Sequence, residues 1–166
     1  MIVALGSNLP GGYPDAAALL ESALEAFPAH GLTIVARSSW WRSAAWPDPA
    51  EPAYTNGVVL VETALSVRDA LLQLHEIEAA FGRRRAALNA ARTLDLDLIA
   101  YGRARVEEGG LTVPHPRAHE RRFVMGPLAQ IAPRWTHPTL KATAAGLAAA
   151  ATVGRDAAPW PCGVAQ

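Results

Sequence analysis

Apolar and polar positions follow two kinds of pattern along the first two thirds of the chain. Short apolar runs bounded by turn residues predict strands over residues 2–5, 32–41, 56–64 and 94–100. Apolar residues spaced three and four apart predict helices over residues 15–27 and 66–81, after the first and third strands. The order of strand, helix, strand, strand, helix and strand is the ferredoxin-like βαββαβ pattern, with helices packed on a mostly antiparallel sheet.

The last third of the chain predicts helices more than strands. A returning edge strand of the sheet is expected from Val106 and a short extended segment over 111–113. Helices are expected over 120–131 and 140–151. Prolines and glycine interrupt the sequence after this point, so we expect a loose tail over about 152–166. The sequence therefore predicts a single α+β domain over residues 1–166 with a C-terminal helical extension.

Composition narrows the class of protein and its partners. With 51% hydrophobic and 18% charged residues, a chain of 166 residues can bury a sizeable core as a compact globule. Fifteen basic and fifteen acidic residues cancel, so the charge does not favour nucleic acid or an anionic membrane as a partner. The N-terminus lacks a signal-peptide pattern, and no apolar run reaches the roughly 18 residues of a membrane span. We expect a cytoplasmic protein that acts as a monomer.

The most informative stretch is the predicted strand that carries Asp95 and Asp97. Residues two apart in a strand share a face, so both carboxylates lie on one side and Leu94, Leu96 and Leu98 on the other. Like charges side by side destabilise a sheet unless a cation neutralises them, and paired oxygen ligands suit Mg²⁺. The alternative is a solvated pair on an exposed face, but aspartate is disfavoured in strands. We predict a magnesium site.

Arginines bracket this strand in the sequence. They are Arg83, Arg84, Arg85 and Arg92 before it, and Arg117, Arg121 and Arg122 after it. A run of charges is more often a solvated face, and we expect Arg84 and Arg122 at the surface. The guanidinium fork fits phosphate oxygens, so the other arginines could neutralise a triphosphate if both flanking loops fold over one site. His115, locked between two prolines, could contact the same phosphates.

Aromatic residues supply a second kind of candidate. They are Trp40, Trp41, Trp46, Tyr54 and Phe123. Most are expected in the core, but some could enclose a flat heterocycle beside the amide of Asn56. The chain has neither a Walker A loop nor a Gly-x-Gly-x-x-Gly loop, which excludes the nucleotide sites built on them. The residues alone predict metal-assisted phosphoryl or nucleotidyl transfer and leave the acceptor open.

Five segments in order carry a resemblance to a known family. They are Ala4-Leu5-Gly6-Ser7-Asn8, Tyr54-Thr55-Asn56-Gly57, Ile77-Glu78 with Phe81-Gly82-Arg83, Arg92-Thr93-Leu94-Asp95-Leu96-Asp97, and residues 111–117 with Arg121-Arg122-Phe123. With these segments the chain resembles the 6-hydroxymethyl-7,8-dihydropterin pyrophosphokinases of folate biosynthesis, from residue 2 to about 138. The resemblance implies that the terminal diphosphate of ATP is transferred to the hydroxymethyl group of a reduced pterin, with release of AMP.

The resemblance also implies roles for individual residues. Asp95 and Asp97 would hold two Mg²⁺ ions that bridge the triphosphate, as in a two-metal in-line displacement. Arg83 and Arg92 match the family's phosphate-binding arginines and complete the implied catalytic set. The implied ATP-binding residues are Glu78, Arg83, Arg85, Arg92, Leu98, Thr112, His115 and Arg121. The implied pterin-binding residues are Gly6, Ser43, Ala44, Trp46, Tyr54, Asn56, Asp95 and Phe123.

The chain departs from the family pattern in three places. Many members carry a tryptophan, glycine and proline just ahead of the catalytic arginine, where this chain has Asn89-Ala90-Ala91. The tyrosine after the histidine is Pro116 here, and the usual threonine-proline of the pterin-side loop reads Ser43-Ala44. None of these changes removes an implied metal ligand or phosphate-binding arginine. Two other interpretations remain open at this point: another Mg²⁺-dependent phosphoryl or nucleotidyl transferase, and a non-catalytic ferredoxin-like binding module.

Overall fold

The fold is built around one antiparallel sheet, in a computed structural model that describes residues 1–45, 48–82 and 93–161. Within these residues the main sheet has six strands: β1 (Ile2–Ser7), β2 (Thr33–Arg37), β3 (Trp41–Ser43), β4 (Tyr54–Glu62), β5 (Asp95–Ala100) and β8 (Ala158–Pro159). Their order is β5-β1-β4-β3-β8, and β2 also pairs with β4. A separate hairpin is formed by β6 (Val106–Glu108) and β7 (Leu111–Val113).

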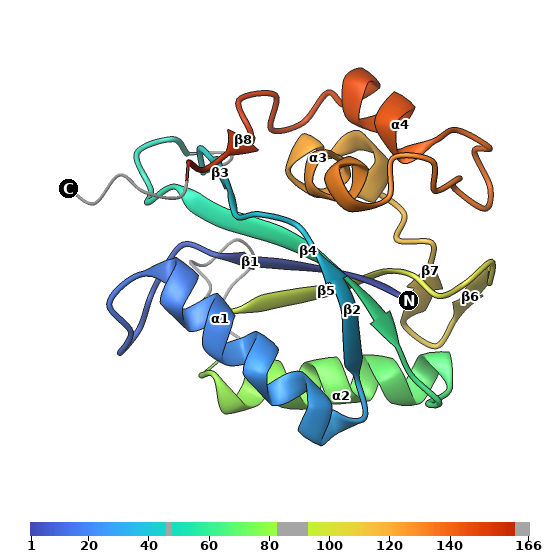
Figure 1. Ribbon diagram of the computed structural model, residues 1–166, viewed down its shortest axis with the longest axis horizontal. Coiled ribbons are helices and arrows are strands. Elements are labelled where there is room, and N and C mark those ends of the chain that lie inside the picture. Colours follow the sequence, from blue (N-terminus) through green and yellow to red (C-terminus); the bar gives the residue numbers. More distant parts are fainter. Residues whose placement is uncertain (46–47, 83–92, 162–166) are drawn as a thin grey trace.

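Helices cover both faces of this sheet (Figure 1). On one face lie α1 (Ala16–Ala26) and α2 (Val67–Ala80), and on the other lie α3 (Arg122–Ile131) and α4 (Ala144–Ala150). Two short 3₁₀ turns are η1 (Phe27–His30) and η2 (Ala118–Glu120). The strand order β5-β1-β4-β2, with α1 and α2 on one face, confirms the predicted ferredoxin-like core. The helices α3 and α4 are the predicted C-terminal extension.

Alternating residues along the central strands form two separate cores. The core under α1 and α2 includes Val3, Leu5, Val59, Leu96 and Leu98, which are all at most 5% exposed. The core under α3 and α4 includes Ile2, Ala4, Val58, Ile99 and Met125. The second core does not extend to the end of the sheet where β1 finishes and β5 begins. That end carries the two aspartates on the α3/α4 face.

Local sequence sets the limits of the first two helices. Asp15 accepts the Ala18 N–H at 2.7 Å, and Ser66 Oγ accepts the Asp69 N–H at 3.1 Å. Such caps satisfy backbone donors that the first turn of a helix leaves unpaired. Gly82 follows α2 with a φ of 85°, a left-handed conformation that favours glycine. Both helices therefore lie within one residue of their predicted bounds.

Three predicted elements differ from the structure. The strand expected over residues 32–41 is divided into β2 and β3. At the break, the Val58 N–H donates to the side-chain Oγ of Ser38 at 3.0 Å. This bond takes the place of the one to the Ser38 carbonyl that would continue the strand. The helix expected over residues 140–151 begins only at Ala144, since Thr143 caps it. The segment near Val106 pairs with β7 alone and does not extend the main sheet.

The expectation of a loose tail is wrong for residues 152–161. Strand β8 pairs with β3, and the Trp160 N–H donates to the Trp40 carbonyl at 2.8 Å. Arg122, expected at the surface, is half-buried and donates to the carbonyls of Ala157 at 3.2 Å and Ala148 at 3.1 Å. These contacts join segments that are distant in the sequence, so no local pattern could predict them. Residues 162–166 lie outside the described residues.

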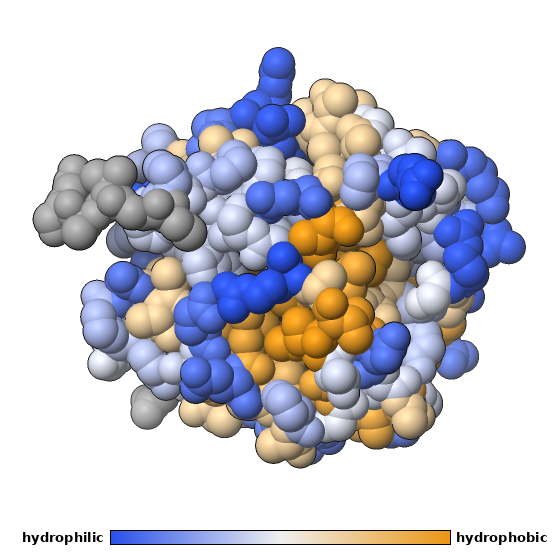
Figure 2. Space-filling model, in the orientation of Figure 1, coloured by the Kyte–Doolittle hydropathy of each residue, from blue (hydrophilic) through white to orange (hydrophobic). Residues whose placement is uncertain are grey.

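The surface shows both apolar and polar areas. Figure 2 shows an apolar area near the centre of one face, with hydrophilic residues around it. Val35 on β2 is one exposed apolar residue, at 52% exposure. No helix within the described residues has the length and apolar character needed to cross a membrane.

Candidate active site

One row of the sheet brings a predicted metal ligand and a predicted pterin-binding residue onto the same face. Gly6 on β1 pairs with Asp95 on β5 and with Asn56 on β4, so the three positions lie side by side. Paired residues of antiparallel strands present their side chains on the same face. Gly6 places no side chain between its neighbours, and a Cβ there would lie 3.5 Å from Asn56 Oδ1. The row is a floor with a carboxylate at one end and an amide at the other.

Asp97 lies in the next row of the same face, opposite Ala4. Its side chain is 34% exposed, and its Oδ2 atom lies 3.9 Å from a guanidinium nitrogen of Arg121, whose side chain is 25% exposed. Arg121 is the N-cap residue of α3, directly after η2. Its Cζ atom lies 5.9 Å over the ring of Phe123. The fold thus joins a predicted metal ligand to a predicted triphosphate-binding residue, and both remain accessible to solvent.

His115 is held beside this pair by the backbone. Its N–H donates to the Ile99 carbonyl at 2.8 Å, and its Nδ1 accepts the Arg117 N–H at 3.1 Å. Burial lowers the pKa of His115 to about 4; the charges of Arg121 and Arg117 also lower it, and Asp95 opposes them. The imidazole is therefore neutral at pH 7. With Nδ1 acting as an acceptor, the neutral ring carries its proton on Nε2 and can donate it to a phosphate oxygen.

The other predicted pterin-binding residues that the structure describes come from β3, the residue after it, β4 and the start of α3. Asn56 Nδ2 donates to Ser43 Oγ at 3.0 Å, and both residues are 5% exposed. This bond uses one amide N–H and leaves the second N–H and Oδ1 for other partners. Tyr54 and Phe123 are half-buried. The N–H of Ala44 donates to Asp156, a residue that the sequence pattern did not single out.

Glu78 lies under the strand that carries the aspartates. It is 2% exposed on α2, and its Oε1 accepts the Leu96 N–H at 2.7 Å. Leu96 stands between Asp95 and Asp97, so Glu78 supports both through the backbone. Sequence resemblance assigned Glu78 to ATP binding, and that contact stays a prediction. Sequence spacing gave no signal for the observed contact, because the two partners come from different elements.

The remaining predicted site residues lie away from this face or outside the described residues. Leu98 is 5% exposed and belongs to the α1/α2 core, on the opposite face of β5 from the aspartates. Thr112 is exposed on β7, opposite Glu107. The residues Trp46, Arg83, Arg84, Arg85, Arg92 and 89–91 lie outside the described residues.

Several known proteins similar to this chain carry the same name. Residues 2–133 match the family described as 7,8-dihydro-6-hydroxymethylpterin-pyrophosphokinase (HPPK). The chain belongs to this family. A 2-amino-4-hydroxy-6-hydroxymethyldihydropteridine pyrophosphokinase of Synechocystis sp. is 44% identical over 139 residues, which are 82% of this chain and 68% of that protein. The protein of the same name from Methylorubrum extorquens is 39% identical over 130 residues, 78% of this chain and 80% of that protein.

Solved structures of HPPK-DHPS proteins share the fold of this HPPK-family chain. The Plasmodium falciparum protein with pteroate has a TM-score of 0.70 over 89% of this chain, at 12% identity. A wild-type structure of the same protein has a TM-score of 0.67, at 13% identity. This chain covers 41% and 44% of those longer chains. At such low identity the likeness concerns the fold alone, and it confirms the predicted fold class.

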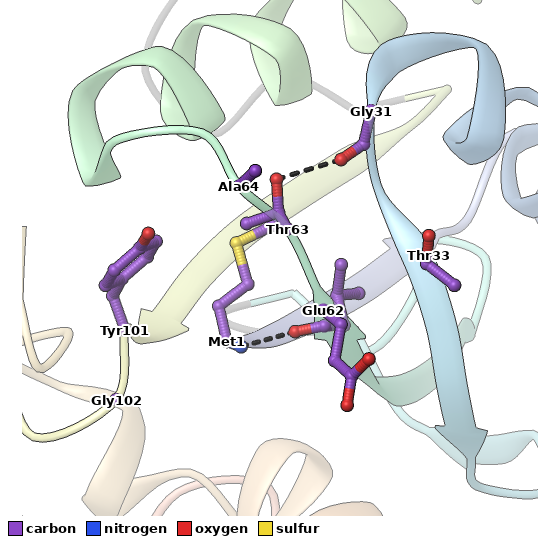
Figure 3. Close-up of a pocket in the computed structure, with 9 residues that line it drawn as sticks. Met1, Gly31, Thr33, Glu62, Thr63, Ala64, Tyr101 and Gly102 are labelled. Atoms are coloured by element: carbon purple, nitrogen blue, oxygen red, sulfur yellow. Dashed lines mark hydrogen bonds between the residues drawn. The ribbon is translucent and has the colours of Figure 1, made fainter.

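Hollows in the surface of this HPPK-family chain do not by themselves mark the site. A hollow of about 780 Å³ lies at the opposite end of the sheet from the aspartates (Figure 3). Its lining includes Met1, Glu62 and Tyr101, and Thr63 Oγ1 donates to the Gly31 carbonyl at its edge, at 2.8 Å. A smaller hollow of about 200 Å³ lies beside His115. The convergence of Asp95, Asp97, Arg121 and Asn56 identifies the candidate site more specifically than the size of a hollow.

Proposed function

We propose that the protein transfers the terminal diphosphate of ATP to the hydroxymethyl group of 6-hydroxymethyl-7,8-dihydropterin, with release of AMP, in folate biosynthesis. Membership of the pyrophosphokinase family supports this activity. The structural observation that carries it is the row of Asp95, Gly6 and Asn56 on one face. Neighbouring strands are about 4.8 Å apart, so Asp95 and Asn56 are separated by roughly 10 Å. A bicyclic ring with its hydroxymethyl arm spans such a distance.

The donor set on this face fits magnesium. Asp95 and Asp97 offer hard oxygen ligands on one face, and Mg²⁺ usually binds one or two carboxylates together with substrate phosphates. Within residues 1–45, 48–82 and 93–161 no group of three or more acidic, histidine or cysteine side chains is placed to hold a metal. We propose two Mg²⁺ ions on these aspartates, bound with ATP. The metal would neutralise phosphate charge and polarise the attacking hydroxyl.

The protein's own residues would bind and orient the two substrates. Arg121 would donate charge-assisted hydrogen bonds to the triphosphate, and neutral His115 would donate from Nε2. Asn56 would read the polar edge of the pterin with the amide groups that Ser43 leaves available. Tyr54 and Phe123 would enclose its flat faces. This arrangement would direct the hydroxymethyl arm along the floor at Gly6, towards Asp95.

Other candidate residues are assigned from the resemblance to the family. Arg83 and Arg92 would stabilise the transition state, with Arg85 as a further phosphate contact. Thr112 would lie on the adenosine side. Leu98 would reach that side only through its backbone, because its side chain is buried in the α1/α2 core. Ala44 and Trp46 would complete the pterin side. A monomeric, cytoplasmic, single-domain protein also stays a prediction, and light scattering after gel filtration would test the monomer.

The activity can be tested with purified full-length protein, Mg²⁺-ATP and the reduced pterin. We expect AMP and pterin diphosphate in equal amounts, measured by anion-exchange chromatography. Chelation of Mg²⁺ should stop the reaction, and its restoration should recover the rate. ATP with unrelated alcohols as acceptors is the control for another phosphoryl transferase. Folded protein that forms no AMP with this pterin would contradict the proposal.

A further inference from the structure

The chain after α4 returns to the candidate pterin site. We call residues 151–160 the C-terminal strap. The strap begins beside the N-terminus of α3, where the Arg122 N–H donates to the Val153 carbonyl at 2.9 Å. It ends as β8, which adds to the edge of β3 (Figure 1). The strap therefore connects the two elements that carry Phe123 and Ser43.

One side chain of the strap bonds the backbone at the end of β3. The Asp156 carboxylate accepts the N–H of Ala44, which belongs to the peptide group joining Ser43 to Ala44. Ser43 Oγ in turn accepts from Asn56 Nδ2 at 3.0 Å. A chain of contacts thus runs from the strap to the amide that would read the pterin. Fixing the peptide plane after Ser43 restricts where its hydroxyl can lie, and with it the amide of Asn56.

A second contact reaches the opposite wall of the same site. Gly154 has a φ of 66°, and a Cβ there would lie 2.5 Å from Cδ1 of Phe123. The backbone of the strap therefore packs directly against the ring that would cover the pterin. Only glycine combines this left-handed conformation with such a close approach.

The strap is also anchored by contacts that do not involve Asp156. Arg122 donates to the Ala157 carbonyl at 3.2 Å, and Arg42 lies 4.9 Å under the ring of Trp160. Ala157 is 2% exposed, whereas Asp156 is an exposed residue. Removal of the Asp156 carboxylate should therefore leave the strap in place and change one contact. This makes the role of Asp156 separable from the stability of the fold.

We propose that the C-terminal strap is the outer wall of the pterin site and that Asp156 is a positioning residue for the pterin, acting through Ala44, Ser43 and Asn56. The proposal rests on the proposed function, since it assigns the pterin to this face. Substitution of Asp156 should affect the pterin and not ATP, because Arg121 contacts the strap at Val153 rather than at Asp156, and His115 is held by its own loop.

The test compares Asp156→Ala, Asp156→Asn and Ser66→Ala in the full-length protein. Calorimetry gives the Kd of the reduced pterin with a non-hydrolysable ATP analogue present, and the Kd of the analogue alone. Asp156→Ala should raise the pterin Kd about three- to tenfold, the range of one hydrogen bond. Asp156→Asn should restore most of the affinity, because its amide oxygen can still accept the Ala44 N–H. Ser66→Ala is the control, since it removes an exposed side chain that accepts a backbone N–H at the far end of α2, together with the bond from the Ser66 hydroxyl to the Asp69 carboxylate.

The possible results separate this inference from the proposed function. A pterin Kd in Asp156→Ala equal to that of Ser66→Ala, with wild-type pterin binding intact, would overturn the inference alone. Equal losses of pterin and ATP-analogue affinity would also overturn it, because they would indicate a general structural role. Wild-type protein that binds no pterin would contradict both. A selective loss in Asp156→Ala with recovery in Asp156→Asn would support the inference.

Discussion

The two faces of the sheet use the same strands for different purposes. On the α1/α2 face, Leu5, Leu96 and Leu98 are at most 5% exposed and form a closed apolar core. On the other face, the alternate residues of β5 are Asp95 and Asp97, and the cover of α3 and α4 ends beside them. A strand of six residues therefore anchors the core with every second side chain and presents charge with the others.

This difference shows how a small domain can position like charges. Asp95 and Asp97 repel each other, and neither can move without moving the leucines between and beyond them. The buried face thus supplies the rigidity that the polar face needs. Substitutions on the two faces should separate activity from stability, even between neighbours on one strand.

The largest expected effect is the loss of activity in Asp97→Ala. Removal of one carboxylate from the proposed metal site should lower kcat about a thousandfold, or roughly 4 kcal/mol of transition-state stabilisation. Pterin binding should change little, because Asn56 and its partner Ser43 are untouched. Steady-state kinetics and pterin titration measure the two quantities. Asp69→Ala, which removes an exposed aspartate at the start of α2, is the control, and unchanged turnover in Asp97→Ala would refute the metal assignment.

The neighbouring substitution Leu96→Ala should have the opposite signature. Leu96 is 3% exposed, so its truncation leaves a cavity and should lower the free energy of unfolding by about 3 kcal/mol. Urea unfolding followed by circular dichroism measures this loss. The folded fraction should still bind Mg²⁺-ATP, because both aspartates remain. A Leu96→Ala protein that keeps its stability but loses activity would contradict the assignment of stability to one face and activity to the other.

The features that sequence predicted best are local. Alternation of side chains along β5 predicts that Asp95 and Asp97 share one face. The structure agrees, because Leu96 and Leu98 are buried on the other face. Helix limits followed from Ser66 and Asp15, whose side chains cap the first turn within three residues. In each case the prediction depends on residues only a few positions apart in the sequence. Local patterns were therefore enough to predict these elements of the fold.

The features that sequence missed depend on distant partners. Asp156 bonds Ala44 across the fold, and nothing near either residue indicates the other. Ser38 interrupts a strand only because Val58 lies opposite its hydroxyl. Arg122 was expected in solvent because a charge run is usually exposed, but its guanidinium donates to the carbonyls of Ala148 and Ala157, which lie far along the chain. The site residues were found by type and by resemblance to the family, whereas their supports required the three-dimensional structure.

Glu78 links the two faces, and its removal should have an intermediate effect. Glu78→Ala takes the side-chain acceptor from the Leu96 N–H, so the free energy of unfolding should fall by about 2 kcal/mol. Activity should fall as well, since the backbone between Asp95 and Asp97 loses the hydrogen bond that holds it to α2. Glu78→Gln keeps an acceptor oxygen and should recover part of both. Full activity in a destabilised Glu78→Ala would show that the aspartates do not need this support.

The smallest expected effect is the dependence of stability on the titration of His115. Its folded pKa is about 4, below the value near 6.5 of an unfolded histidine, because burial and the nearby charges of Arg121 and Arg117 disfavour the imidazolium. The unfolded state therefore binds the proton more readily, so this contribution is complete above pH 6.5 and is lost as the pH falls to about 4. His115→Gln does not titrate, so its free energy of unfolding should fall less steeply across this window. Chemical unfolding at half-unit steps of pH compares the two slopes. Parallel slopes would mean that His115 is as solvated in the folded protein as in the unfolded chain, and they would remove the basis for a neutral hydrogen-bond donor on this face.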